Sequence, residues 1–241
     1  MLYLFKEFGV IEIVTILRVI NMDGRQVKKG PEKGKGAEGS PVKGQEPLTS
    51  KGGKNMVGER EIQRLLDGNK RFVSGEISDK KYPERRGELL EGQQPFVTMI
   101  ACSDSRVDPT ALFDANLGEI FAIETAGNIV DTVSLGSMEY GVDHLNTPLV
   151  VVLSHTKCGA VTATCQGGHA EGNLAKVVET IKPAADKAEN DVNKAIDINA
   201  KMVVDTILEK SPVIKKAVDE GKTKIVVMKY HLETGEVELK E

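Results

Sequence analysis

Two short polar clusters hold the residues of this chain that are best suited to chemistry. Cys102, Asp104 and Arg106 lie in the run CSDSRV, and His155 and Cys158 lie in the run SHTKCGA. Thiolate sulfur and imidazole nitrogen are the ligands that Zn²⁺ prefers. The three ligands Cys102, His155 and Cys158 leave a fourth position for water, which is typical of catalytic zinc. Two core cysteines and a hydrogen-bonded histidine are the unreactive alternative, but three such residues in two clusters favour a metal.

The charged pair in the first cluster suits a supporting role beside a metal. Positions 102, 104 and 106 alternate as in an extended chain, which predicts that their side chains face the same side. Asp104 would accept a hydrogen bond from the reactive water, and Arg106 would hold Asp104 ionised. An ordinary surface ion pair is the alternative. The position of the pair directly after a predicted ligand favours the catalytic role.

The elements that must position these clusters follow a regular pattern from residue 57 onward. Buried strands are predicted at four short, β-branched runs: residues 96–101, 120–124, 149–153 and 224–228. Helices are predicted at residues 59–72, 134–145, 174–190 and 195–209. Alternating strands and helices indicate an α/β fold whose central sheet has parallel core strands flanked by helices. A closing hairpin is predicted around Thr234-Gly235, between residues 231–233 and 236–239.

Both clusters directly follow predicted strands, at residues 96–101 and 149–153. In open parallel sheets, ligands bind in the crevice beyond the carboxyl ends of the strands. We therefore expect the two clusters to face each other across that crevice. The spacing of three residues between His155 and Cys158 predicts a tight turn, entering a helix, that points both side chains the same way.

Composition excludes several other classes of protein. The 241 residues carry 32 basic and 36 acidic side chains, a formal charge of −4, which gives no reason to expect a nucleic-acid partner. Aromatic residues make up only 4% and tryptophan is absent, which argues against stacking on single-stranded bases. Three cysteines are too few for a disulfide framework. No apolar run reaches the ~18 residues of a membrane span.

The first 56 residues differ from the rest. Residues 1–22 are apolar but interrupted by charges, which does not fit a secretory signal. Residues 23–56 are rich in Gly, Lys and Pro, which predicts a flexible linker. Met22 or Met56 is an alternative start site. We expect residues 57–241 to form the catalytic domain and, because thiol ligands need a reducing compartment, a cytoplasmic location.

The motifs resemble those of the β-class carbonic anhydrases. The resemblance rests on CSDSRV at residues 102–107, AGN at 126–128 and HTKCGA at 155–160, in this order. It extends from about residue 59 to residue 239, through LLDGNKRFVSG at 65–75, GQQP at 92–95 and LETGEV at 232–237. It does not cover residues 1–55.

The resemblance implies a function and a role for each matching residue. It implies one zinc ion per chain, held by Cys102, His155 and Cys158, with Asp104 and Arg106 as the catalytic pair. The implied reaction is the reversible hydration of CO₂ to bicarbonate and a proton by a zinc-bound hydroxide. The family assembles as homodimers or higher homo-oligomers with the substrate pocket at the dimer interface. Four positions match substrate-binding residues of the family by spacing: Gln93, Phe121, Ala126 and Tyr140.

The sequence also departs from the family pattern. Ser154 stands where the family usually has Gly, and Glu124 stands where Arg is common. Neither residue is a predicted ligand, so the departures affect the expected rate rather than the reaction. The chain has no Trp, so an inhibitory bicarbonate site that uses Trp is not expected.

Alternatives for the site and the function stay open at this point. Cys165 lies seven residues after Cys158 and could be a fourth ligand that closes the site. Asp104 could take the same position in an inactive state. The same fold and metal could serve a hydrolase of COS or CS₂. A non-catalytic zinc-binding protein is a further alternative, although structural zinc has no need of Asp104.

Overall fold

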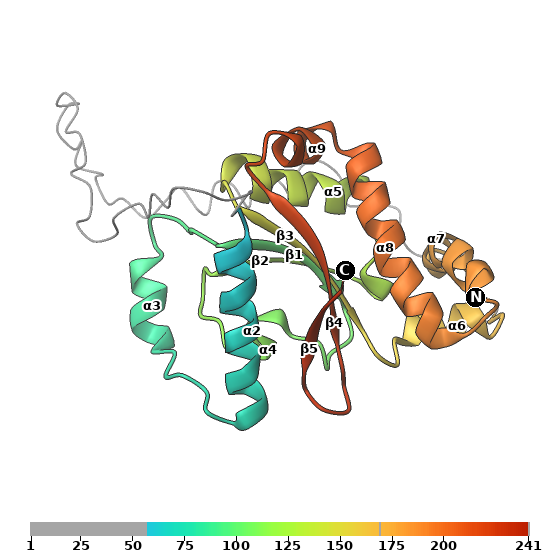
Figure 1. Cartoon of the computed structure of the whole chain (residues 1–241), viewed down its shortest axis with the longest axis horizontal. Coiled ribbons are helices and arrows are strands. Elements are labelled where there is room, and N and C mark those ends of the chain that lie inside the picture. Colours follow the sequence, from blue (N-terminus) through green and yellow to red (C-terminus); the bar gives the residue numbers. More distant parts are fainter. Residues whose placement is uncertain (1–56, 169, 241) are drawn as a thin grey trace, which may run out of the picture. The chain divides into compact units, whose positions relative to one another are not determined.

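A five-stranded sheet organises the part of the chain that the structure describes. The computed structural model describes residues 57–168 and 170–240. The strand order is β2-β1-β3-β4-β5, with helices around the sheet (Figure 1). The strands are β1 (Val97–Cys102), β2 (Ile120–Thr125), β3 (Leu149–His155), β4 (Lys224–Tyr230) and β5 (Val237–Lys240). β1 to β4 run parallel and β5 runs antiparallel to β4, which confirms the predicted fold class.

The two central strands are apolar because both of their faces are covered. Every residue of β1 and β3 is buried. Continuous apolar runs of this kind are typical of parallel strands that have helices on both faces. β2, at one edge of the sheet, alternates between half-buried and exposed residues instead.

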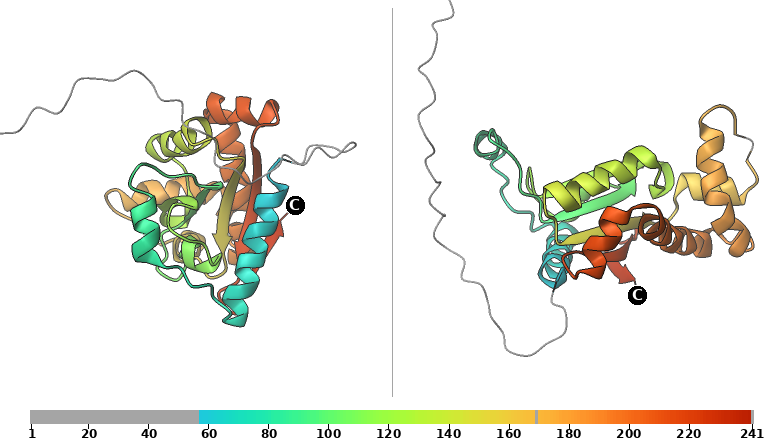
Figure 2. Two further views of the ribbon diagram at one scale, coloured as in Figure 1. Left: turned by 90° about the vertical axis from the view of Figure 1, so that its left-hand side faces the viewer. Right: turned by 90° about the horizontal axis from the view of Figure 1, so that it is seen from above.

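Helices cover both faces of the sheet (Figure 2). The helices are α2 (Glu59–Ser74), α3 (Tyr82–Glu88), α4 (Pro109–Leu112), α5 (Thr132–Glu139), α6 (Gly159–Cys165), α7 (Leu174–Lys187), α8 (Val192–Lys210) and α9 (Pro212–Asp219). On one face, Leu65 of α2 and Leu112 of α4 pack in a core with Val151. On the other face, α5, α8 and α9 pack in a second core with Val150 and Val152.

Two predicted elements differ from the observed ones. The helix predicted at residues 134–145 is α5 followed by a π-helical turn, Tyr140–His144. The closing hairpin is present, but its arms are β4 and β5, and residues 231–233 lie in the connection. β4 runs to Tyr230 because its pairing with β5 extends it beyond the predicted end at residue 228.

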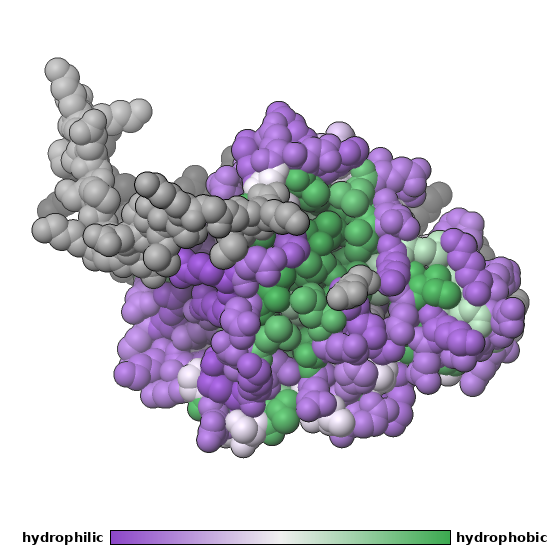
Figure 3. All heavy atoms as spheres, viewed as in Figure 1, coloured by the Kyte–Doolittle hydropathy of each residue, from purple (hydrophilic) through white to green (hydrophobic). Residues whose placement is uncertain are grey.

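An apolar surface lies over β4 and β5 between α2 and α8 (Figure 3). An open hollow at this surface is lined in part by Val204, Ile225, Val226, Val227 and Leu239. None of the helices in the described residues has the length and apolar composition of a membrane span. The predictions for residues 1–22 and 23–56, and the alternative start sites, lie outside the described residues.

Candidate metal centre

The three predicted ligands meet at the carboxyl ends of two neighbouring strands. Cys102 is the last residue of β1, His155 is the last residue of β3, and Cys158 is the N-cap of α6. Their ligand atoms all lie within 4.8 Å of one another. The two Sγ atoms are 3.9 Å apart. Two sulfurs bound tetrahedrally to zinc at ~2.3 Å would be about 3.8 Å apart, so the observed spacing fits a shared zinc ion.

The turn between β3 and α6 brings His155 and Cys158 together. Lys157 takes a left-handed conformation, with φ 56°, which reverses the chain between the two ligands. Thr156 is held by residues of the connection between β4 and β5 and by the end of β4 itself. Its N–H donates to Tyr230 O (2.9 Å), its Oγ1 donates to Glu233 Oε2 (2.8 Å), and that same Oγ1 accepts from Leu232 N–H (3.0 Å).

The imidazole of His155 is prepared for coordination. Its Nδ1 lies 2.9 Å from Thr156 O, and since a carbonyl only accepts, Nδ1 carries the hydrogen. Nε2 therefore has a free lone pair. This atom is buried and has no hydrogen-bond partner among the described residues. Because buried polar atoms are normally paired, the unpaired Nε2 is what a metal ligand requires.

The thiols of Cys102 and Cys158 lie where a bound cation would take the place of their protons. Both are buried. A hydrogen bond from Cys158 lowers the pKa of Cys102 although burial raises it, and the neighbouring His155 and the N–H of Gly127 lower it further. The pKa of Cys158 is raised because it donates to Cys102 and is itself buried. Cys102 and Cys158 would hold a dication as thiolates, because thiols bind metals in their deprotonated form.

The donor set fits zinc with a position left for water. Two thiolates and one imidazole match the ligand types of zinc enzymes. Within the described residues, neither Cys165 nor Asp104 belongs to the group of close ligand atoms. Cys165 ends α6, and its half-buried thiol has a raised pKa, mainly because of burial. The arrangement therefore favours three protein ligands over four.

Asp104 and Arg106 form a two-point ion pair next to this group. Arg106 Nε lies 2.8 Å from Asp104 Oδ1, and Nη2 lies 2.7 Å from Oδ2. The hydrogen bonds from Arg106 lower the pKa of Asp104 to about 2 despite partial burial. The extended backbone expected at positions 102–106 is wrong. A turn closed by Val107 N–H donating to Asp104 O (2.8 Å) brings the pair together instead.

The turn Ala126–Asn128 supports the metal ligands from the side. Gly127 N–H donates to Cys102 Sγ at 3.3 Å, and Asn199 Nδ2 on α8 donates to Gly127 O at 3.0 Å. The AGN run is recognisable in the sequence, but neither contact is predicted from it. The available signal was a polar residue, Asn199, between the apolar positions Ile196 and Val203 of a helix.

Four positions match the family's substrate-binding residues by spacing, and they are separated from the metal ligands in the sequence. Phe121 on β2 is half-buried, Tyr140 is 47% exposed, and their ring centroids are 5.9 Å apart. Ala126 is exposed at the end of β2. Gln93 is exposed in the segment between α3 and β1, and no hydrogen bond in the described residues joins it to the ligands. The structure thus brings Phe121 and Tyr140 together but not Gln93.

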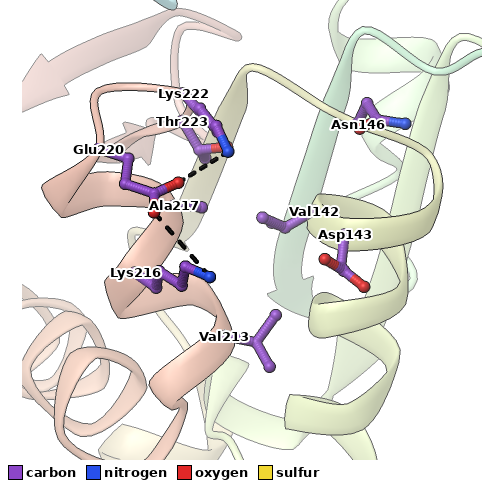
Figure 4. Close-up of a pocket in the computed structure, with 9 residues that line it drawn as sticks. All are labelled: Val142, Asp143, Asn146, Val213, Lys216, Ala217, Glu220, Lys222 and Thr223. Atoms are coloured by element: carbon purple, nitrogen blue, oxygen red, sulfur yellow. Dashed lines mark ion pairs between the residues drawn. The ribbon is translucent and has the colours of Figure 1, made fainter.

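A separate cavity of about 370 Å³ lies between the π-helical turn and α9 (Figure 4). Glu220 at this cavity pairs with Lys216 and Lys222, so the charges of these three side chains largely compensate one another. Asn146 and Thr223, which also line it, precede β3 and β4. The cavity therefore lies at the amino ends of the strands, whereas the metal ligands lie at the carboxyl ends.

Comparison with known proteins agrees with this geometry. A sequence profile of the family described as "Carbonic anhydrase" matches residues 97–237. The chain is 37% identical over 185 residues to a carbonic anhydrase of Mycolicibacterium smegmatis, covering 73% of this chain and 90% of that one. It is 34% identical over 186 residues to Carbonic anhydrase 2 of Mycobacterium tuberculosis, with the same coverage. Its fold is similar to that of the β-carbonic anhydrase CcaA, with a TM-score of 0.61 at 25% identity over 75% of this chain and 95% of that one.

Fold and site together define a class of protein: an α/β sheet with two cysteines and a histidine at the ends of parallel strands, and a charged pair beside them. The family profile and the relatives then give the family. The chain belongs to the β-carbonic anhydrases.

Proposed function

We propose that the chain catalyses the reversible hydration of CO₂ to bicarbonate and a proton. The observation that carries the proposal is the buried, unpaired Nε2 of His155 within ligand distance of two cysteine sulfurs. The family profile and the carbonic anhydrase relatives support the same reaction. Bicarbonate and CO₂ are then the small-molecule partners.

We infer that zinc is the cofactor, with Cys102, His155 and Cys158 as its ligands. Zinc supplies a Lewis acid that lowers the pKa of water to near 7 when it is bound. The thiolates of Cys102 and Cys158 offset the charge of the cation inside the core. The hydrogen bond from His155 Nδ1 to Thr156 fixes the ring so that Nε2 faces the two sulfurs.

Asp104 is the residue that orients the attacking water in this proposal. With a pKa of about 2, its carboxylate is ionised at neutral pH and can accept a hydrogen from that water. Arg106 is the positioning residue, because it occupies both carboxylate oxygens and fixes their direction. A lone pair of the water is then free to face the carbon of CO₂.

The substrate pocket is proposed to be completed by a second copy of the chain. Phe121 and Tyr140 lie at the open edge of the sheet, and Tyr140 is 47% exposed in the single chain. An exposed strand edge with apolar rings is a surface that association covers. Gln93 would then donate a hydrogen bond to an oxygen of CO₂ or bicarbonate, and Phe121 and Ala126 would keep the pocket apolar. Because the thiols must stay reduced, we propose a cytoplasmic location.

The test combines metal analysis with stopped-flow CO₂ hydration on the purified full chain. We expect about one zinc per chain and hydration that is lost when a chelator removes the metal. Parallel assays with COS and CS₂ separate this reaction from hydrolysis of the sulfur analogues. Full zinc content without CO₂ hydration would contradict the proposal, and size-exclusion chromatography with light scattering tests the homo-oligomer.

A further inference from the structure

Asn199 is a buried polar residue on the apolar face of α8. Asn199 is only 3% exposed. The other residues on the same buried face of α8 include Ala195, Ile196 and Val203. Burying an amide among apolar side chains is unfavourable unless the amide is hydrogen-bonded. Its Nδ2 has such a partner, the carbonyl oxygen of Gly127, at 3.0 Å.

Gly127 takes a left-handed conformation that suits glycine and disfavours other residues. Its φ is 71° and its ψ is 21°, in the left-handed region, and Asn128 next to it also has a positive φ of 46°. A Cβ atom at position 127 would lie 2.7 Å from Ile181 Cδ1 on α7. The turn is therefore pressed against α7 on one side and tied to α8 by Asn199 on another.

The same turn points a backbone donor at a metal ligand. Gly127 N–H lies 3.3 Å from Cys102 Sγ. A hydrogen bond to a thiolate withdraws charge from the sulfur and fixes its direction, so it tunes how strongly the sulfur holds a cation. The two hydrogen bonds of Gly127, one accepted at its carbonyl and one donated by its N–H, connect α8 with the metal centre.

We propose that Asn199 is a positioning residue for Cys102, acting through the backbone of Gly127. Without the amide donor, Gly127 O loses this hydrogen bond inside the core, and an unpaired buried acceptor is unfavourable enough to favour rotation of the turn. Rotation removes the N–H donor from Cys102 Sγ. The inference rests on the proposed zinc centre, and it assigns to α8 a role in metal retention beyond packing.

The test uses the full chain loaded with Co²⁺, whose thiolate charge-transfer absorption reports directly on the sulfur ligands. In Asn199→Leu, which keeps the branched shape of the side chain, and Asn199→Ala, which is the safer variant for folding, we expect this band to move to longer wavelength. We also expect a chelator to remove the metal about 10- to 100-fold faster than from the wild type.

Val203→Ala is the matched control, one turn further along the same buried face of α8. It removes core packing without touching the turn, so we expect the wild-type band and the wild-type rate of metal loss. An unchanged band and rate in both Asn199 variants would overturn the inference, as would equally fast metal loss from Val203→Ala. Either result leaves the proposed zinc centre unaffected, provided that the wild type binds metal. If the wild type binds no metal, both the zinc centre and the role of Asn199 are contradicted.

Discussion

Arg106 holds both carboxylate oxygens of Asp104, although only one residue separates them in the chain. Arg106 N–H also donates to Asp104 Oδ1, at 3.1 Å. Three donors from one residue thus fix the carboxylate in one orientation. A pair that served only surface stability would gain ~1 kcal/mol or less from such contacts. We propose that the fixed orientation of the carboxylate serves catalysis.

Replacing Asp104 with Asn tests that use. The amide keeps the size of the side chain but no longer offers two equivalent acceptors to the attacking water. We expect kcat for CO₂ hydration to fall about 100-fold or more, in the range of general acid–base effects. Zinc content, measured on the same sample, should stay at the wild-type level. Turnover at the wild-type rate would show that Asp104 does not orient the water.

Replacing Cys158 with Ser tests the ligand set. Serine is a poor zinc ligand at neutral pH, so we expect loss of most of the bound zinc, loss of hydration and a lower melting temperature. Cys165→Ser is the matched control, because Cys165 lies outside the group of close ligand atoms. It should keep zinc and activity. If Cys165→Ser lost the metal as well, the site would have four protein ligands.

Two glycines inside helices predict opposite effects of the same substitution. A Cβ at Gly68 in α2 would lie 1.9 Å from the backbone oxygen of Phe113, so α2 and α4 must separate in Gly68→Ala. A Cβ at Gly136 in α5 meets nothing within 4 Å. We expect Gly68→Ala to destabilise the fold by roughly 3 kcal/mol or more, and Gly136→Ala to stabilise it by about 0.5–1 kcal/mol. Urea unfolding measures both changes, and a neutral Gly68→Ala would mean that the helices are not in close contact.

Asp114 predicts an acid-dependent contribution to stability. Burial raises the pKa of its carboxyl, but Lys80, Arg71 and Ser78 donate to it, and the net result is a pKa of about 2. A lowered pKa stabilises the fold fully above the ordinary value near 4, and this contribution is lost as the pH falls toward 2. The contribution is on the order of 2 kcal/mol.

The variant Asp114→Asn isolates this contribution. We expect it to lower the free energy of unfolding at pH 7, and the gap to the wild type should narrow between pH 5 and pH 3. The gap is the quantity to follow, because acid also protonates the thiolates of the metal centre. Asp186→Asn, which removes an exposed pair with Lys182 on α7, should change stability by less than ~0.5 kcal/mol. A gap that is the same at both pH values would contradict the assigned pKa.

The four parallel strands and the position of the ligands could be predicted because they depend on a simple rule. Strands with two covered faces are apolar throughout, and polar residues that follow such strands lie at one edge of the sheet. The observed strands begin within one residue of the predicted starts. Their ends run one or two residues further, because backbone pairing continues into polar residues such as Ser154, whose Oγ donates to Met228 O.

The remaining features depend on contacts between residues far apart in the sequence. The turn that joins Asp104 to Arg106 is set by one backbone hydrogen bond, which alternation of residue types does not reveal. Asn199 and Gly127 are 72 positions apart, and their contact follows only from the packing of α8 beside the turn that follows β2. The short helices α4 and α9 have too few residues for a clear helical period. The assignment of Gln93 and Tyr140 to the substrate pocket stays a prediction.

The hydrogen bonds that hold Thr156 determine when the metal centre is completed as the protein is made. The residues that supply the sulfur and nitrogen donors are made before residues 230–233, which hold Thr156 through hydrogen bonds. The histidine ring therefore gains its final orientation only after residues 230–233 have folded back beside β3. A chain cut before residue 230 would lack these groups, and we expect its distant metal centre to be left incomplete.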